Sequence, residues 1–278
     1  MLRLRVATAA ILIPILIIVL WYGQPVLGIV IGLVVLLAAA ETADLLRRAG
    51  LPVNSLVIVG LGLLAVGEAA ISAAHGDVAL AVWVILVLVG AALASLATPD
   101  MRQALLGWAG MVFGALYVGM LAFLLRISLS VVDSGAEGRL ADTLDPGRTW
   151  LLIVVLGVWA YDSSAYVVGR LIGRGHFFAH ISPHKTVSGA LGGSLGALVV
   201  CTLLGFSIGR PAEGVGVGVV LGLAAPVGDL TESILKRAAG VKDSGQLIPG
   251  HGGMLDRVDS FIVAGPFVWL YLAAVGLV

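Results

Sequence analysis

The sequence predicts an all-α, polytopic integral membrane protein with about nine transmembrane helices and a cytoplasmic N-terminus. Of its 278 residues, 60% are hydrophobic and only 12% are charged, and the mean hydropathy is +1.10. So few charged side chains cannot cover a water-exposed surface, because soluble domains are about a quarter charged. Apolar runs of about 20 residues also recur along the chain, which is the length that a helix needs to cross a bilayer.

Nine apolar runs are separated by charged residues or by glycine and proline. The expected spans are 5–22, 25–40, 55–74, 78–97, 104–125, 151–172, 189–209, 214–236 and 260–278. The second is short, and the eighth carries Asp229, Glu232 and Lys236 in its last turns. The first could be mistaken for a signal peptide, but no small-residue cleavage site follows it, which favours an uncleaved span.

The basic residues favour one orientation in the membrane. With the N-terminus in the cytoplasm, twelve of the sixteen Lys and Arg residues lie on the cytoplasmic side, as the positive-inside rule requires. Arg126, Arg139, Arg148 and Arg210 remain outside, the first three in a loop of about 25 residues. We expect a transmembrane scaffold with this outer loop over 1–150 and a catalytic region with cytoplasmic loops over 151–278.

Charge and cysteine content exclude some functions. Sixteen acidic residues balance sixteen basic ones, so no net charge attracts nucleic acid, and no nucleic-acid partner is expected. Cys201 is the single cysteine and allows neither an internal disulfide nor a multi-cysteine metal site. Glycines at helical spacing in 189–209 and 214–236 predict close helix packing rather than a substrate groove.

Ionisable residues persist between residues 159 and 259, although each is costly within a bilayer. Asp162 lies inside the sixth span, and we expect it to be functional, although a structural partner such as Arg170 could neutralise it. Ser182, Lys185 and Thr186 precede a predicted helix start, where free N–H groups and the helix dipole favour a phosphate. An ordinary capped loop explains these three residues equally well.

The segment 228–259 is the richest in polar chemistry. Asp229, Ser233 and Lys236 are spaced i, i+4 and i+7, so they share one face of a predicted helix. Asp256 and Asp259, three residues apart, repeat this arrangement on a second short helical turn. Separated carboxylates favour a hard cation such as Mg²⁺ together with substrate phosphates, so the predicted metal ligands are Asp229 and Asp256.

Basic residues surround these carboxylates in larger number than pairing requires, which indicates a polyanionic substrate. They are Lys185, Lys236, Arg237, Lys242 and Arg257. A loop that is basic only for topology would not explain the interleaved aspartates. His251 lacks partners at zinc-ligand spacing, so it either binds a phosphate or orders the turn at Gly252 and Gly253.

Three motifs together resemble the phosphatidate cytidylyltransferase family, also called CDP-diacylglycerol synthases. The main one is the 27-residue signature Ser233-x-x-Lys236-Arg237, Lys242-Asp243, His251-Gly-Gly-x-x-Asp256-Arg257-x-Asp259. Asp162-x-x-Ala-Tyr-x-x-Gly-Arg170 and Ser182-Pro-x-Lys185-Thr-x-x-Gly189 support it, so the resemblance covers about residues 159–260. Ser188 stands where the family usually has a glutamate, which leaves the role of that glutamate in doubt here.

The resemblance implies a multi-pass enzyme of the bacterial plasma (inner) membrane, with its active site facing the cytoplasm. It would join CTP and phosphatidic acid into CDP-diacylglycerol and pyrophosphate with Mg²⁺. It also implies a homodimer and a second, monovalent cation. The alternatives are a cytidylyltransferase or CTP-dependent kinase acting on another membrane lipid, and an ion-coupled secondary transporter, although no internal repeat supports the transporter.

The residues suggest how such a transfer would work. A phosphomonoester loses its second proton with a pKa of about 6, so the attacking lipid phosphate needs no general base. The remaining task is to bring two anions together, which positioned cations do. In this hypothesis Asp229 and Asp256 hold Mg²⁺, while Lys236, Arg237, Lys242 and Arg257 neutralise phosphate oxygens. Lys185 steadies either phosphate, and Asp162, Asp259 and Ser233 have secondary roles.

Overall fold

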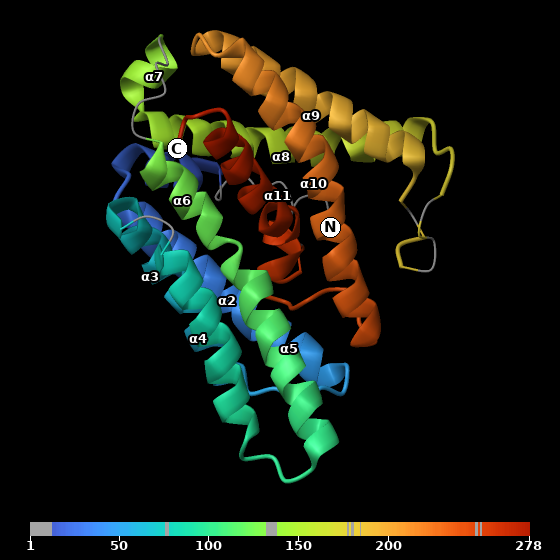
Figure 1. Ribbon diagram of the computed structural model, residues 1–278. Coiled ribbons are helices and arrows are strands. Elements are labelled where there is room, and N and C mark those ends of the chain that lie inside the picture. The colour runs from blue at the N-terminus through green and yellow to red at the C-terminus, as the bar shows by residue number, and fades with distance from the viewer. Residues whose placement is uncertain are drawn as a thin grey trace. The chain divides into compact units, whose positions relative to one another are not determined.

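The computed structural model describes residues 13–75, 78–131, 138–176, 178, 181–183, 185–247, 250 and 252–278, and these residues are mainly helical (Figure 1). The helices are Ile13–Tyr22, α2 (Val26–Arg48), α3 (Ser55–His75), α4 (Val78–Ser95), α5 (Met101–Gly119), α6 (Ala122–Ser130), α7 (Arg139–Thr143), α8 (Pro146–Leu171), α9 (Val187–Ser207), α10 (Pro211–Ala238) and α11 (Leu255–Ala274). Within the described residues, eight segments are long and apolar enough to cross a membrane, with α5 and α6 counted together, and Ile13–Tyr22 is a shorter apolar helix. Residues 5–12 of the first predicted span lie outside the described residues. The predicted class of a polytopic helical membrane protein is confirmed.

The observed helices extend beyond several predicted spans where charges are locally satisfied. Helix α2 continues to Arg48, well past the predicted end at residue 40, and Asp44 pairs with Arg47 and Arg48 in its last turn. Helix α8 begins at Pro146 because the Asp145 side chain accepts a hydrogen bond from the Arg148 backbone N–H, with an N–O distance of 2.8 Å. Aspartate as the capping residue, with proline directly after it, is a typical helix start.

The expected outer loop of about 25 residues was wrong in extent. Helix α6 runs through Arg126 to Ser130, and the short helix α7 occupies Arg139–Thr143. Arg126 is buried and forms an ion pair with Glu68 of α3, while its guanidinium lies 5.5 Å from the centre of the Phe123 ring. A buried charge is tolerated when a partner neutralises it, so the arginine did not end the helix as hydropathy predicted.

The chain forms two compact units, and each is built from two separate stretches of sequence. The first comprises residues 1–126 and 234–258, and the second comprises residues 127–233 and 259–278. In the first unit α3 packs against α2, α4 and α5. The Trp83 indole N–H of α4 donates to the Leu61 carbonyl of α3 across 2.9 Å. The functional division at residue 150 remains a prediction.

Glycines bring three helices of the second unit into close contact. A Cβ atom added at Gly192 or Gly193 of α9 would press on Val168 or on the Tyr161 ring of α8. Farther along α9, the Cα atoms of Gly205 and Gly214 approach each other between α9 and α10. The predicted role of these small residues in helix packing is confirmed, and Gly157 of α8, which faces both Cys201 of α9 and Leu221 of α10, shows that the three helices meet one another (Figure 1).

Candidate functional site

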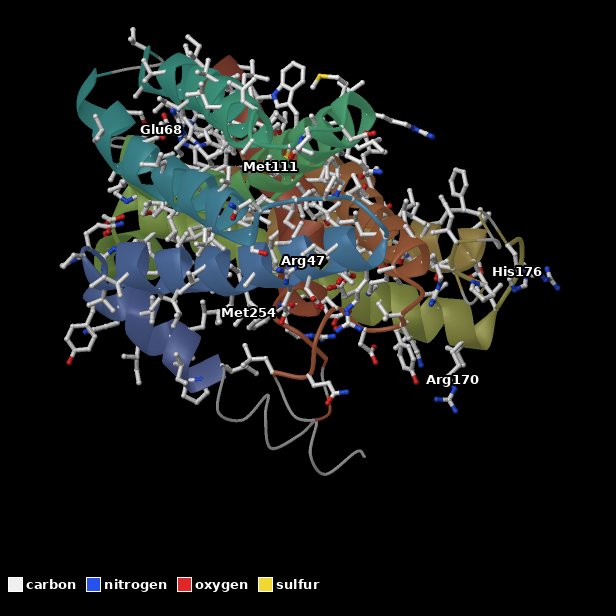
Figure 2. The ribbon with its side chains drawn as sticks, turned by 90° about the horizontal axis from the view of Figure 1, so that it is seen from below. Arg47, Glu68, Met111, Arg170, His176 and Met254 are labelled. Atoms are coloured by element: carbon white, nitrogen blue, oxygen red, sulfur yellow. The ribbon has the colours of Figure 1, made fainter. Side chains whose placement is uncertain are left out.

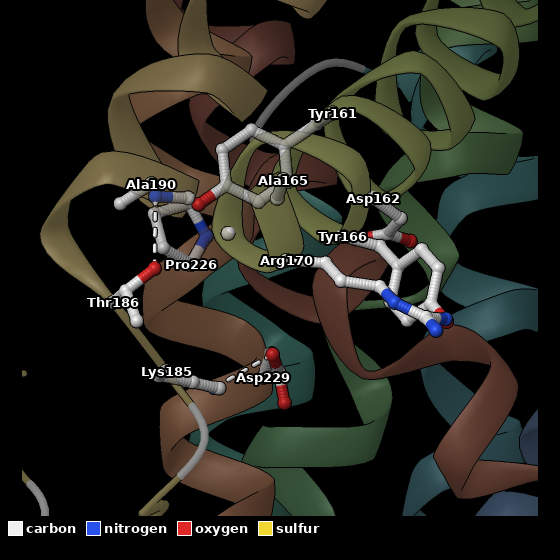
Figure 3. A pocket seen from close by; sticks show the side chains of 12 residues that line it. Tyr161, Asp162, Ala165, Tyr166, Arg170, Lys185, Thr186, Ala190, Pro226 and Asp229 are labelled. Carbon is white, nitrogen blue, oxygen red and sulfur yellow. Dashed lines mark hydrogen bonds and ion pairs between the residues drawn. The ribbon is translucent and has the colours of Figure 1, made fainter. Parts of the chain in front are cut away.

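An open pocket of about 490 Å³ lies in the second unit, where α8, α9 and α10 approach one another (Figure 3). Its lining includes four of the predicted site residues, which are Asp162 of α8, Lys185 and Thr186 before α9, and Asp229 of α10. The sequence separates these residues widely, and the fold brings them to one cavity. The remaining lining comes mainly from Tyr161, Tyr166, Arg170 and Pro226.

Lys185 and Asp229 form the central ion pair of this pocket. The Lys185 Nζ lies 2.6 Å from Asp229 Oδ2, and the two side chains point toward each other (Figure 3). The side chains are 20% and 39% exposed, but the Lys185 Nζ itself is buried, so Asp229 is the more accessible member of the pair.

The loop before α9 presents its backbone to the same pocket. Thr186 is the N-cap of α9, and its Oγ1 accepts a hydrogen bond from the Gly189 backbone N–H at 3.0 Å. Ser188, the departure from the family pattern, accepts a hydrogen bond from the Arg174 backbone N–H at 3.1 Å and so ties the two ends of the loop. Ser182 stabilises the turn, because its carbonyl accepts from the Lys185 backbone N–H.

Asp229 also belongs to an acidic cluster with Glu232 and Asp259. Carboxylate oxygens of these three residues lie within 4.8 Å of one another, close enough to bind one metal ion. Glu232 is fully buried, whereas Asp229 and Asp259 are partly exposed. Three carboxylates form a hard, all-oxygen donor set, which suits Mg²⁺ or Ca²⁺ better than zinc.

A second polar cluster lies in the first unit, around Asp256 in the first turn of α11. The Lys236 Nζ lies 2.7 Å from Asp256 Oδ1. Asp256 Oδ2 accepts hydrogen bonds from the backbone N–H groups of Ser244 and Gly253, both at 2.8 Å, and lies 2.9 Å from the Ser244 Oγ. Both carboxylate oxygens of Asp256 therefore already accept hydrogen bonds or an ion pair. The role of Asp256 as a metal ligand stays a prediction.

The other predicted residues have more varied surroundings. Arg237, Lys242 and Arg257 are exposed, and Arg237 donates to the Val241 carbonyl at 3.0 Å. Ser233 is buried on α10. Gly252 adopts a φ of +79°, which an L side chain rarely adopts, as the predicted turn requires. His251 lies outside the described residues.

Figure 2 shows Arg170 and His176 projecting outward near the end of α8 and in the loop that follows. The Arg170 Nη1 donates to the Tyr166 hydroxyl at 2.9 Å, on the same helix. Arg170 lines the pocket, and both side chains are exposed on the unit that carries Lys185.

Sequence reasoning missed three residues of these clusters. Glu232 was noticed as a charge in the eighth span but not as a metal-site candidate, although its spacing of three from Asp229 could have indicated it. Ser244 contacts both Asp256 and Glu41. Glu41 could not have been assigned, because it lies on α2, about 200 residues away in the chain, and only the fold brings it to this cluster.

Comparison with known proteins identifies a family and several similar enzymes. A model of the "Cytidylyltransferase family" matches residues 3–275. Phosphatidate cytidylyltransferase of Synechocystis sp. is 45% identical over 130 residues, which cover 45% of this chain and 44% of the relative. That of Bacillus subtilis is 41% identical over 130 residues, with 46% and 48% covered.

A plant relative extends the similarity further along this chain. Phosphatidate cytidylyltransferase 5, chloroplastic, of Arabidopsis thaliana is 39% identical over 180 residues, which cover 59% of this chain and 45% of the relative. The matches thus span about half the length of each of these three curated relatives. Because the family model covers nearly all of the sequence, the chain belongs to the cytidylyltransferase family.

Proposed function

We propose that this chain transfers the cytidylyl group of CTP to phosphatidic acid in a Mg²⁺-dependent reaction, which yields CDP-diacylglycerol and pyrophosphate. The observation that carries the proposal is the pocket in which Lys185 is paired with Asp229 beside an acidic cluster, at the end of membrane-spanning helices. The names of the similar proteins support the choice of substrates.

In the proposed step, an oxygen of the lipid phosphate attacks the α-phosphorus of CTP. The bond between this phosphorus and the bridging oxygen to the β-phosphate breaks, and pyrophosphate leaves with the electron pair. No proton transfer is needed, because the phosphomonoester is already ionised near neutral pH. The chain must therefore position two anions and neutralise their repulsion.

The acidic cluster of Asp229, Glu232 and Asp259 fits a divalent cation, since its oxygens are hard donors within reach of one ion. Mg²⁺ bound to such a site supplies positive charge to the phosphate oxygens. Lys185 would bind a phosphate of either substrate, and its position in the lining of the pocket, 2.6 Å from Asp229, supports this role. The basic residues Lys236, Arg237, Lys242 and Arg257 would bind the remaining phosphate oxygens, and Asp256 is retained as a second proposed ligand.

The proposed activity is tested with the purified full chain, CTP labelled at the α-phosphate, and defined lipid phosphates. We expect label on phosphatidic acid only when Mg²⁺ is present, and loss of this transfer in Asp229→Asn and Asp256→Asn. Label appearing on an isoprenoid phosphate alone would reassign the lipid. Transfer from γ-labelled but not α-labelled CTP would identify a kinase, and the proposal would be abandoned.

We also propose a cytoplasmic N-terminus in a bacterial plasma membrane, with both polar clusters facing the cytoplasm. The distribution of basic residues supports this orientation. In a Cys201→Ala background, a membrane-impermeant maleimide should label Asp142→Cys in intact cells but Gln246→Cys only after permeabilisation. The reverse labelling would invert the topology. The homodimer and the monovalent cation rest on the family resemblance alone.

A further inference from the structure

The loop between α10 and α11 is held from a distant part of the chain, by a carboxylate on α2. The Glu41 Oε1 accepts a hydrogen bond from the Met254 backbone N–H at 2.9 Å, and its Oε2 accepts from the Leu255 N–H at 2.8 Å. The Oε2 also accepts from the Ser244 hydroxyl at 2.7 Å. All of these residues belong to the first unit.

These contacts bind the start of α11. Leu255 is the first residue of the helix, so the two backbone N–H groups are among those that no carbonyl within the helix can satisfy. A carboxylate is favoured at such a position by hydrogen bonding and by the helix dipole. Glu41 thus caps α11 from outside its own sequence, while Asp256 within α11 accepts from the Gly253 N–H.

Ser244 joins the two carboxylates. Its Oγ lies 2.7 Å from Glu41 Oε2 and 2.9 Å from Asp256 Oδ2, yet a hydroxyl has a single proton to donate. The backbone N–H of Ser244 remains bound to Asp256 in either case. Asp256 in turn holds the Lys236 ammonium, so a continuous set of contacts runs from Glu41 to Lys236.

The surroundings show that the loop is built around Glu41. Ser244 and Leu255 are buried, and the Cα of Gly253 lies so close to the Glu41 carboxylate that a side chain at this position would overlap it. Gly245 is also in contact, because an added Cβ would lie 2.7 Å from Glu41 Oε1. The glycines of the loop therefore allow its backbone to close around this carboxylate.

We infer that Glu41 is a positioning residue for the cytidylyl transfer, because it fixes the loop that orients Asp256 and, through it, Lys236. The effect of Glu41 on turnover rests on the proposed function, whereas its anchoring of the loop does not. Glu41 need not contact a substrate, and its effect reaches the phosphates through the ammonium of Lys236. Loss of the carboxylate should loosen the loop and lower turnover more than it weakens CTP binding.

Glu41→Gln is the decisive variant, since it preserves shape and removes one acceptor oxygen. In the wild type, each of the two N–H groups donates to its own carboxylate oxygen. In glutamine one of these oxygens is replaced by an NH₂ group, which cannot accept, so the Met254 or the Leu255 N–H loses its acceptor. Hydrogen–deuterium exchange of the full chain in detergent should show the amides of 252–256 exchanging at least about tenfold faster, the scale expected for a lost hydrogen bond to a charged group. Exchange at the wild-type rate would overturn the anchoring.

Turnover provides the second measurement. We expect kcat of Glu41→Gln to fall about tenfold or more, with a smaller change in KM for CTP, and Glu41→Asp to recover part of kcat because it keeps the charge. Asp44→Asn is the matched control. Asp44 lies about one turn along α2, where it forms ion pairs with Arg47 and Arg48, so both exchange and kcat should match the wild type.

The two measurements separate the possible failures. A wild-type chain without cytidylyl transfer would overturn the proposed function, while the exchange experiment would still decide whether Glu41 anchors the loop. Faster exchange in Glu41→Gln together with an unchanged kcat would overturn the positioning role. If kcat fell as far in Glu41→Asp as in Glu41→Gln, the negative charge at this position would not matter for turnover, and the positioning role would also be overturned.

Discussion

Lys185 and Asp229 form an ion pair between the loop that precedes α9 and the C-terminal half of α10, with Nζ and Oδ2 2.6 Å apart. The pair joins two motifs that lie far apart in the chain, the Ser-Pro-x-Lys-Thr segment and the acidic face of α10. Because Asp229 also belongs to the acidic cluster, Lys185 lies beside the group most suited to a metal ion. A phosphate at this place would contact an ammonium on one side and a bound cation on the other.

Replacing Lys185 by methionine should therefore impair binding and transfer together. We expect kcat/KM to fall about a hundredfold in Lys185→Met, the upper range for losing a hydrogen bond to a charged group. Lys185→Arg keeps the charge but replaces a compact ammonium by a planar fork, so it should retain more activity than the methionine variant. Initial rates over a range of CTP concentrations provide the measurement.

Arg102→Gln serves as the basic-residue control, since Arg102 is an exposed side chain at the start of α5. It should leave kcat/KM unchanged. Equal losses in the two variants would mean that overall positive charge, and not the contact with Asp229, explains the effect of Lys185.

Glu232 offers a separate test of the acidic cluster. It is fully buried and has a carboxylate oxygen within 4.8 Å of those of Asp229 and Asp259. Removing its charge in Glu232→Gln should raise the Mg²⁺ concentration for half-maximal activity by about tenfold to a hundredfold, as is common when a metal site is altered. Direct titration with Mn²⁺, followed by the electron paramagnetic resonance of the free ion, measures binding without turnover.

Glu213→Gln is the matched variant on the same helix. Glu213 lies in the first turn of α10 and pairs with Arg210 at 3.2 Å, apart from the acidic cluster. Its Mn²⁺ affinity should equal that of the wild type. If Glu232→Gln bound Mn²⁺ just as tightly, Glu232 would not belong to the metal site.

The ion pair between Glu68 and Arg126 should affect the stability of the folded protein and not the rate of the reaction. Both side chains are almost completely buried in the first unit, at 6% and 4% exposure. Truncating one partner strands the other charge, so Glu68→Ala should lower the free energy of unfolding by about 3–5 kcal/mol. Thermal unfolding in detergent checks this value.

A double variant separates the cost of the stranded charge from the value of the pair. In Glu68→Leu/Arg126→Met neither charge remains, and apolar side chains fill the space, so stability should return to near that of the wild type. A double variant as unstable as Glu68→Ala would show that the pair itself contributes strongly to stability.

Much of the fold followed from the sequence because apolar length is a local property. Hydropathy located the spanning helices. Their ends depend also on capping residues such as Asp145, which hydropathy does not take into account. Arg126 shows the same weakness inside a helix. A charge that is neutralised by a distant partner does not end a span, and hydropathy has no information about that partner.

The candidate site followed from the sequence only in part. The sequence predicted that Lys185 lies near Asp229, because charged residues in a membrane protein are costly and few, and the two residues do line one pocket. Their direct pairing, and the contact of Glu41 with the loop before α11, depend on how the helices pack. Contacts between residues far apart in the chain cannot be predicted from the residue spacing of a single sequence.

Gly253 provides a last test, because its small size has a specific structural cause. A methyl group at this position would overlap the Glu41 carboxylate and the Ser244 hydroxyl. Gly253→Ala must therefore displace one of these groups or move the backbone whose N–H donates to Asp256. We expect a loss of at least about tenfold in kcat, comparable to that of Glu41→Gln, since both changes disturb the same hydrogen bonds.

Gly60→Ala is the matched control for Gly253→Ala. An added Cβ at Gly60 of α3 meets no atom within 4 Å, so the substitution should preserve kcat, and the higher helix propensity of alanine should not lower the unfolding temperature. Combining Gly253→Ala with Glu41→Gln should cost little beyond either change alone, because residues in one hydrogen-bond network are not additive. Full additivity would show that Gly253 acts independently of Glu41, and the shared loop anchor would then not explain its effect.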